Sequence, residues 1–378
     1  MSPATAIAVN GRFLTQRVTG VQRFAREITL ALDAMAAAGE APPARVLCPP
    51  EERGSAAPSP FPHLPLKRVG RLRGQAWEQA ELPRAARGAV LVSLGNTAPL
   101  LAAGRQAVVI HDAGVFDTPE SYSLPFRAWY RALHLALSRC GARLLTVSEF
   151  SRGRIAARLR LDPARIGVVR EGGEHILRAP ADRGVLARHG LAPGRFALVV
   201  GTRAAHKGLD GLREAAALLA GRGLSLAVAG AADPSVFRDA ADPRGSAVVA
   251  LGRVSDAELR ALYEAALCLV FPSRYEGFGL PPLEAMTCGC PVVAAAAGAV
   301  PEVCGDAALW FDPPGGGGGP RHRHLTDALA RLLDEPGLAE AMRRRGLARA
   351  TLFSWRHAAE GLLRLLPPLP TPLKDIAA

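Results

Sequence analysis

Two glutamates eight positions apart, Glu276 and Glu284, bracket a glycine-rich loop. The loop follows an apolar run at 267–271 and enters a helix through two prolines, which suit the first helical turn. Its backbone amides should therefore lie near a helix N-terminus, where anions bind. A carboxylate accepts two hydrogen bonds and so matches a vicinal diol of a ribose or a hexose. Amides for phosphate and carboxylates for diols together indicate a sugar nucleotide. The loop residues assigned to this site are Gly277, Phe278, Gly279 and Leu280.

The same segment has a structural interpretation. Glu284 can serve as a favourable acid in the first turn of the helix, and the two glycines can form a tight turn. Spacing alone leaves both interpretations open.

Two cations, Arg203 and Lys207, follow the apolar run at 197–200. In an open α/β sheet the ligand crevice lies at the carboxyl ends of the strands, so both side chains should reach it. Together they can neutralise a leaving diphosphate by electrostatic stabilisation. Only three of the 46 basic residues are lysine, which makes this lysine informative; the alternative is a solvated loop with ordinary charges. Gly201 and Thr202, at the start of the loop, are also expected to bind the donor.

A histidine, His111, ends the apolar run at 108–110, in the ligand-side position of an earlier strand. It can hydrogen-bond a sugar hydroxyl, or it can simply be satisfied by Asp112 or by backbone. Further upstream, Gly20 precedes a helix and can let the backbone approach a phosphate. This last signal is weak, because the chain has neither a GxGxxG fingerprint nor a GxxxxGK[ST] loop.

The elements that position these residues alternate between apolar strands and helices, twice over. With 378 residues this pattern predicts two doubly wound α/β domains. We place an N-terminal, acceptor-side domain at 1–178 and a nucleotide-sugar-binding domain at 179–352. A helix and tail at 353–378 are expected to pack back toward the N-terminal domain.

Charge is distributed unevenly along the chain. Of the net charge of +12, residues 1–180 hold 24 basic against 14 acidic side chains, which gives +10. This half is therefore expected to meet an anionic partner, such as a membrane surface, a phosphorylated acceptor or nucleic acid. Nucleic acid is disfavoured, because aromatic residues make up only 5% and no nucleic-acid-binding motif occurs.

Other functional classes are excluded by pattern. No apolar run approaches the roughly 20 residues that span a bilayer, and the N-terminus lacks a signal-peptide pattern, so we expect a cytoplasmic protein. None of the six cysteines lies in a CxxC pair, which favours buried free thiols over a metal site.

The Glu276 to Glu284 segment and the stretches after it resemble the C-terminal signature of glycosyltransferase family 4. That family consists of retaining enzymes of GT-B architecture, in which two Rossmann-like domains face each other across a cleft. The resemblance spans nearly the whole chain. The N-terminal motifs resemble a subgroup that contains bacterial mannosyltransferases of surface-polysaccharide assembly. They are found at 10–12, 19–23, 96–99, 110–112, 147–150 and 353–355.

The resemblance assigns roles to individual residues. Glu284 matches the glutamate that binds the donor ribose, and Glu276 matches the one that faces the transferred sugar. Lys207 and an arginine would bind the diphosphate, His111 would lie beside the donor sugar, and Gly20 near its phosphate. The loop amides at 277–280 would contact sugar and diphosphate. The family usually works without a metal or other cofactor.

Two segments depart from the family pattern. The residue before Lys207 is His206 where the family commonly has arginine, so either Arg203 or His206 fills the second diphosphate-binding position. The segment at 169–175, which reads VREGGEH, also differs from the usual interdomain sequence.

The function implied is hexose transfer, mannose by analogy with the subgroup, from a nucleotide diphosphate sugar to a glycan or polyprenyl-diphosphate-linked acceptor. The work would take place at the inner face of the cytoplasmic membrane, with peripheral contact to anionic lipid. Two alternatives remain from the residues alone. One is an epimerase or a hydrolase that uses the two glutamates as acid and base. The other is a basic, non-enzymatic protein that binds membrane surfaces.

Overall fold

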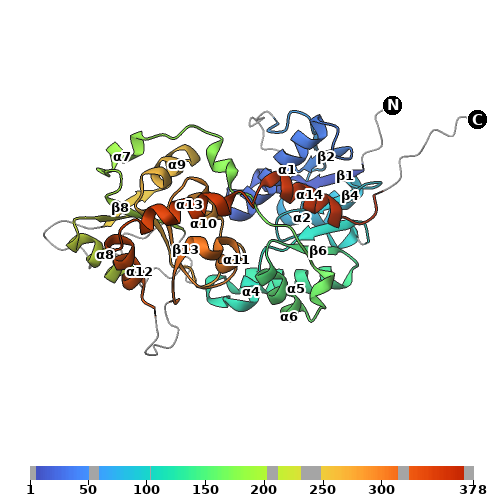
Figure 1. The fold of residues 1–378 in the computed structure, drawn as a ribbon. Helices are drawn as coiled ribbons and strands as arrows, with labels where there is room; N and C mark the ends of the chain where they lie inside the picture. Colours follow the sequence, from blue (N-terminus) through green and yellow to red (C-terminus); the bar gives the residue numbers. More distant parts are fainter. Residues whose placement is uncertain are drawn as a thin grey trace, which may run out of the picture. The chain divides into compact units, whose positions relative to one another are not determined.

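The computed structural model describes residues 6–50, 59–102, 104–201, 212–230, 248–313 and 323–369. Contacts divide the chain into two units, the first formed by Met1–Glu171 with Trp355–Ala378 and the second by Gly172–Ser354. Figure 1 shows both units as sheets covered by helices. The first division lies seven residues earlier than the sequence predicted, because the short helix η5 (Glu174–Leu177) packs on helices of the second unit.

The first unit is built on a parallel sheet of seven strands in the order β3-β2-β1-β4-β5-β6-β7. Its strands are β1 (Ile7–Asn10), β2 (Ala44–Cys48), β3 (Leu66–Arg68), β4 (Val90–Ser93), β5 (Gln106–Val109), β6 (Arg143–Thr146) and β7 (Gly167–Val168). Its α-helices are α1 (Gly20–Ala37), α2 (Gly74–Ala80), α3 (Leu82–Ala85), α4 (Gly114–Asp117), α5 (Leu124–Arg139), α6 (Glu149–Leu159) and α14 (Trp355–Leu365). The last helix packs against α1, with the Trp355 ring 6.0 Å from that of Phe24.

The second unit has a parallel sheet of six strands in the order β10-β9-β8-β11-β12-β13. Its strands are β8 (Phe196–Gly201), β9 (Ser225–Gly230), β10 (Val248–Gly252), β11 (Cys268–Phe271), β12 (Val292–Ala295) and β13 (Ala308–Phe311). Its α-helices are α7 (Gly184–Arg188), α8 (Leu212–Gly221), α9 (Asp256–Ala265), α10 (Leu280–Thr287), α11 (Val300–Cys304), α12 (Leu325–Asp334) and α13 (Leu338–Ala350).

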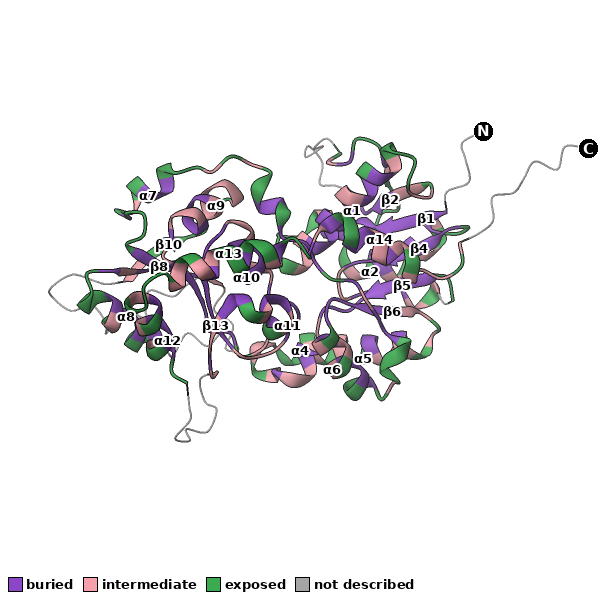
Figure 2. Cartoon of the chain, in the orientation of Figure 1, coloured by how far each residue is buried: buried purple, intermediate pink, exposed green. Residues whose placement is uncertain are grey.

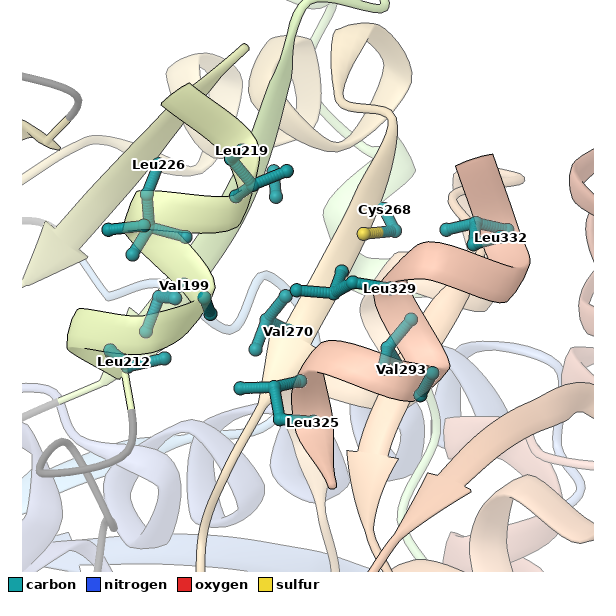
Figure 3. Close-up of a cluster of buried hydrophobic side chains, with 14 of the residues drawn as sticks. Val199, Leu212, Leu219, Leu226, Cys268, Val270, Val293, Leu325, Leu329 and Leu332 are labelled. Carbon is teal, nitrogen blue, oxygen red and sulfur yellow. The ribbon is translucent and has the colours of Figure 1, made fainter. Parts of the chain in front are cut away.

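In both units the strands are mostly buried, and the helices around them carry exposed residues (Figure 2). In the second unit the core lies between the sheet and two helices that cover it, α8 and α12. Leu212 and Leu219 from α8 and Leu329 from α12 are completely buried, and their side chains point toward the sheet residues Val199 and Val270 (Figure 3). This packing requires continuously apolar strands, which is the pattern that the sequence shows.

The doubly wound class predicted from the sequence is confirmed, but two strands were missed. Strand β2 lies between two Pro-Pro pairs, and β3 is a three-residue edge strand whose Lys67 and Arg68 are exposed. Neither has the long apolar run that marks a central strand. The six cysteines are free, as predicted, but only four are buried, since Cys140 and Cys288 are half-buried. Burial raises the pKa of Cys268 and Cys304 to about 12.

Each sheet has one point at which the direction of winding reverses. In the second unit the chain moves from β8 outward to β10 and then returns to β11, on the other side of β8. In the first unit it moves from β1 to β3 and returns to β4. Sheets of this kind bind ligands at the carboxyl ends of the two strands that flank such a switch point. Among the described residues, no helix is long and apolar enough to cross a membrane.

Candidate active site

The loop after β11 leads from the switch point of the second unit into α10. Gly279 caps this helix with a φ of 110°, a left-handed conformation that glycine adopts without strain. Gly277 and Phe278 are buried, and the Phe278 ring meets that of Phe353 edge to face at 5.9 Å. Leu280 is the first residue of α10. The four predicted loop residues thus lie at the N-terminal end of a helix, where backbone amides attract an anion.

The backbone of Glu276 is held by the turn that follows β12. The amide of Ala299 donates to the Glu276 carbonyl at 3.1 Å. Gly298, at a φ of 62°, lies so close that a Cβ there would come within 2.6 Å of the Glu276 nitrogen. The side chain of Glu276 is partly exposed. Two turns, one after β11 and one after β12, therefore fix the backbone position from which the Glu276 side chain extends.

Glu284 lies in the second turn of α10, and the first turn carries no acid. Its interpretation as a first-turn acid is therefore wrong. The side chain is only 6% exposed. The Nε2 of His175 bonds to its Oε1 at 2.8 Å, and the hydroxyl of Tyr263 donates to its Oε2 at 3.0 Å. Both carboxylate oxygens are thus held from inside the protein.

The two partners of Glu284 are side chains that sequence analysis did not assign to the site. Tyr263 comes from the buried face of α9, and nothing in its sequence context distinguishes it from a core residue. Burial and the negative charge of Glu284 raise the pKa of Tyr263 well above its ordinary value, so the phenol stays protonated and donates. His175 lies in the segment that departs from the family pattern, and that departure was the available signal.

At the end of β8, Gly201 pairs with Gly230 of β9. A Cβ on Gly230 would come within 2.0 Å of the Gly201 carbonyl oxygen, so the two strand ends approach closely only because Gly230 has no side chain. Gly201 therefore lies at the switch point, as expected from its place in the chain. Thr202, Arg203, His206 and Lys207 lie outside the described residues.

His111 follows β5 and is buried in the first unit. Its Nε2 bonds to the Leu94 carbonyl at 3.0 Å, and its Nδ1 lies 3.8 Å from Oε1 of the buried Glu171. The Phe24 ring meets the imidazole edge to face at 4.8 Å. The alternative in which His111 is satisfied by a backbone group is therefore confirmed by the contact with Leu94. Asp112 is not the partner, since its Oδ1 accepts from the Gly114 amide instead.

The switch point of the first unit is occupied by a buried polar network. Glu78 of α2 accepts from Asn10 at 2.6 Å and from Arg12 Nε at 3.2 Å. Arg12 also donates to the Thr97 hydroxyl at 2.6 Å. Gly20, by contrast, is exposed at the start of α1, and a Cβ there would meet nothing within 4 Å. Within the first unit, space alone does not require a glycine at that position.

Comparison with known proteins supplies the family. Residues 188–349 match the model described as glycosyl transferases group 1. The O-antigen chain mannosyltransferase B of Escherichia coli is 35% identical over 271 residues, which cover 67% of this chain and 68% of that protein. The D-inositol 3-phosphate glycosyltransferase of Actinosynnema mirum is 33% identical over 237 residues, which cover 58% of this chain and 56% of that protein.

The fold is shared with solved glycosyltransferases. The structure of WaaG, a glycosyltransferase involved in lipopolysaccharide biosynthesis, superposes with a TM-score of 0.68 at 19% identity, over 96% of this chain and 99% of that one. The switch-point loop at 272–280 and Glu284 lie within the part that matches the family model. The chain is therefore a glycosyltransferase, of GT-B architecture, and belongs to the group 1 glycosyltransferases that the family 4 resemblance indicated.

Proposed function

We propose that this glycosyltransferase moves mannose from GDP-mannose to a glycan or a polyprenyl-diphosphate-linked acceptor during assembly of a surface polysaccharide, with retention at the anomeric carbon. The observation that carries the proposal is Glu284, a buried carboxylate with both oxygens held, on the helix that begins at the switch point of the second sheet. The choice of mannose and of a polysaccharide acceptor follows the similarity to the E. coli O-antigen mannosyltransferase.

In this proposal the second unit binds the nucleotide sugar. Glu284 accepts hydrogen bonds from the ribose diol, because an ionised carboxylate has about four lone-pair directions and two are already used. The amides at the start of α10 bind the diphosphate with the help of the helix dipole. Gly201 and Thr202 line the same edge. Glu276 and His111 are assigned to the transferred hexose, and Gly20 to its phosphate.

The chemical step is substitution on one face of the sugar. The acceptor oxygen forms a bond to the anomeric carbon while the bond from that carbon to the diphosphate oxygen breaks. The acceptor proton passes to an oxygen of the leaving diphosphate. Lys207, with Arg203 or His206, neutralises the negative charge that develops, so the reaction needs no metal. Loss of one such contact slows an enzyme by roughly 10²–10³.

Mechanism and reaction class can each be tested on the product. Retention predicts that nuclear magnetic resonance shows the anomeric configuration of the donor preserved in the new linkage. A stable glycosyl-enzyme on Glu276, trapped and seen by mass spectrometry, would replace same-face substitution by a two-step mechanism. A hydrolase or an epimerase would consume the donor equally well without an acceptor, whereas a transferase should depend on it strictly. Activity that survives exhaustive treatment with EDTA is expected.

A peripheral contact with anionic membrane is part of the proposal and is supported by two features of the first unit. Helix α5 exposes large apolar side chains near its N-terminal end, with Leu124 68% and Trp129 41% accessible. At its other end a hollow is lined by Arg139, Arg160 and Arg165, together with Arg158, which pairs with Asp117. In the described part of the chain no carboxylate pairs with the first three of these arginines. Aromatic and arginine side chains together are typical of surfaces that bind the interface of anionic bilayers.

A donor panel tests the proposed function directly. The protein is incubated with GDP-mannose, UDP-glucose, UDP-N-acetylglucosamine, dTDP-rhamnose and ADP-glucose, and nucleotide release is followed by mass spectrometry. Slow release from GDP-mannose alone is expected, and it should be abolished in Glu284→Ala and Lys207→Ala. Release from a different donor would correct the sugar and keep the class. No release and no thermal stabilisation by any nucleoside diphosphate would overturn the proposal.

A further inference from the structure

The segment that joins the two units carries a partner for an assigned site residue at each end. At its start, Glu171 faces the imidazole of His111 in the first unit. Four residues later, His175 bonds to Glu284 in the second unit. Only Gly172, Gly173 and Glu174 lie between them. The stretch that departs from the family sequence is therefore the stretch that holds these two side chains.

Close packing fixes the second half of this segment on α10. A Cβ on Gly173 would come within 2.6 Å of the Thr287 hydroxyl and 2.8 Å of the Leu283 side chain. The absence of a side chain lets η5 lie directly on the helix that carries Glu284. At the end of η5 and just after it, a guanidinium nitrogen of Arg260 donates to the carbonyls of Leu177 and Ala179 at 3.0 and 2.9 Å. The backbone on both sides of His175 is thus anchored.

The environment of Glu284 makes such partners necessary. Glu284 is 6% exposed, His175 is 3% exposed and Tyr263 is completely buried. A buried carboxylate without hydrogen-bond donors is strongly destabilised. His175 and Tyr263 each supply one donor, and because they approach different oxygens they also fix the rotation of the carboxylate. Two lone-pair directions remain for a ligand.

We propose that His175 is a positioning residue for the donor nucleotide: with Tyr263 it holds the Glu284 carboxylate so that its two remaining lone-pair directions accept the hydrogen bonds of the ribose diol. The inference rests on the proposed assignment of Glu284 to the ribose. Preorganised acceptors bind more tightly because no side-chain freedom is lost on binding. The effect of His175 should therefore appear in nucleotide affinity, and only when the nucleotide has its diol.

The test measures the dissociation constants of GDP and of 2′,3′-dideoxy-GDP by calorimetry, with the corresponding pair of uridine nucleotides in parallel. In the wild type, removal of the diol should weaken binding by roughly 10- to 100-fold, since hydrogen bonds to a charged group are among the stronger ones. His175→Leu should bind GDP about tenfold more weakly and the dideoxy compound equally well. His175→Gln, which keeps a donor at the position of Nε2, should recover most of the lost affinity.

A second buried histidine provides the matched control. His134 is also 3% exposed, and its Nε2 bonds to the Asn96 carbonyl in the first unit. His134→Leu should lower the melting temperature without altering the ratio of the two dissociation constants. In steady-state kinetics, His175→Leu should raise KM for the donor while kcat changes by less than about threefold, as expected for lost ground-state binding.

The outcomes separate this inference from the proposed function. A folded His175→Leu that distinguishes GDP from its dideoxy analogue as strongly as the wild type overturns the role of His175. A wild type that distinguishes neither nucleotide pair overturns the ribose assignment of Glu284 itself. Should His175→Leu fail to fold, His175→Ala and Tyr263→Phe decide: unchanged discrimination in both counts against positioning, and reduced discrimination in the alanine variant, with recovery in His175→Gln, supports it.

Discussion

Each unit of this glycosyltransferase buries one carboxylate beside the switch point of its sheet, and the two are compensated differently. Glu78 in the first unit is 1% exposed and is neutralised by the guanidinium of Arg12, with a further hydrogen bond from Asn10. Glu284 in the second unit is 6% exposed and is held by an imidazole and by a phenol. Neither the burial nor the position in the fold distinguishes the two residues.

The difference lies in what each carboxylate can still do. Arg12 compensates the charge of Glu78 inside the protein and is bonded onward to Thr97, while the other oxygen of Glu78, Oε2, is buried and has no hydrogen-bond partner among the described residues. Tyr263 brings no charge to Glu284, because burial and the carboxylate raise its pKa well above the ordinary value. A carboxylate held by such donors keeps accepting capacity for a diol. The comparison therefore indicates a structural role for Glu78 and a binding role for Glu284.

The strongest loss of activity is expected when the binding carboxylate, Glu284, is removed. Glu284→Ala should reduce kcat/KM for the donor by roughly 10²–10⁴, because two hydrogen bonds from the ribose to a charged group are lost. The decrease is measured by steady-state release of the nucleotide. The melting temperature should fall only modestly, since the two donors left behind are satisfied by water that enters the vacated space. A loss of activity that tracks the fraction unfolded would assign Glu284 to stability instead.

At Glu78 we expect the opposite result, a loss of stability without a loss of nucleotide affinity. Arg12→Met leaves this carboxylate buried and unpaired, which should lower the free energy of unfolding by about 3–5 kcal/mol. Chemical denaturation measures the change. The double variant Arg12→Met with Glu78→Leu should recover most of it, because well-packed apolar residues often replace a buried ion pair at little cost. The folded fraction should keep its nucleotide affinity; a selective loss of that affinity would place Arg12 and Glu78 in the donor site.

Sequence analysis selected the candidate binding residues of the second unit because chemistry and backbone signals coincide there. A glycine in the left-handed region, two prolines and two acids lie within nine residues, from Glu276 to Glu284. The paired strands and their winding followed from apolar runs, apart from β2 and β3.

The partners of these residues could not be predicted, because they come from distant parts of the chain. His175 and Glu284 are 109 positions apart, and Tyr263 lies on a helix whose pattern is that of any core-facing helix. Glu78 and Arg12 are separated by 66 positions. Which buried acid meets an arginine and which meets a histidine and a tyrosine is decided by tertiary packing, and no local sequence pattern predicts it.

A third variant sharpens the comparison at His111, where a carboxylate faces an imidazole rather than a guanidinium. Glu171→Gln removes the negative charge 3.8 Å from Nδ1 and leaves the Leu94 contact in place. We expect kcat to fall by about three- to tenfold, equivalent to about 1 kcal/mol, with little change in nucleotide affinity. Glu174→Gln, at an exposed position in the same segment, is the control. Equal behaviour of the two variants would contradict a specific role for Glu171.

An effect of similar size, but on KM rather than on kcat, is expected at Tyr263, where one neutral hydrogen bond to Glu284 is removed. Tyr263→Phe should raise the donor KM by about threefold to tenfold, since such a bond contributes roughly 1 kcal/mol and His175 still holds the other oxygen. Because the pKa of Tyr263 is raised well above its ordinary value, the phenol donates throughout the range from about pH 6 to pH 9. The ratio of KM between variant and wild type should therefore stay constant over that range. A ratio that falls toward one as the pH rises would mean that the phenol loses its proton there, and that Glu284 is held by His175 alone.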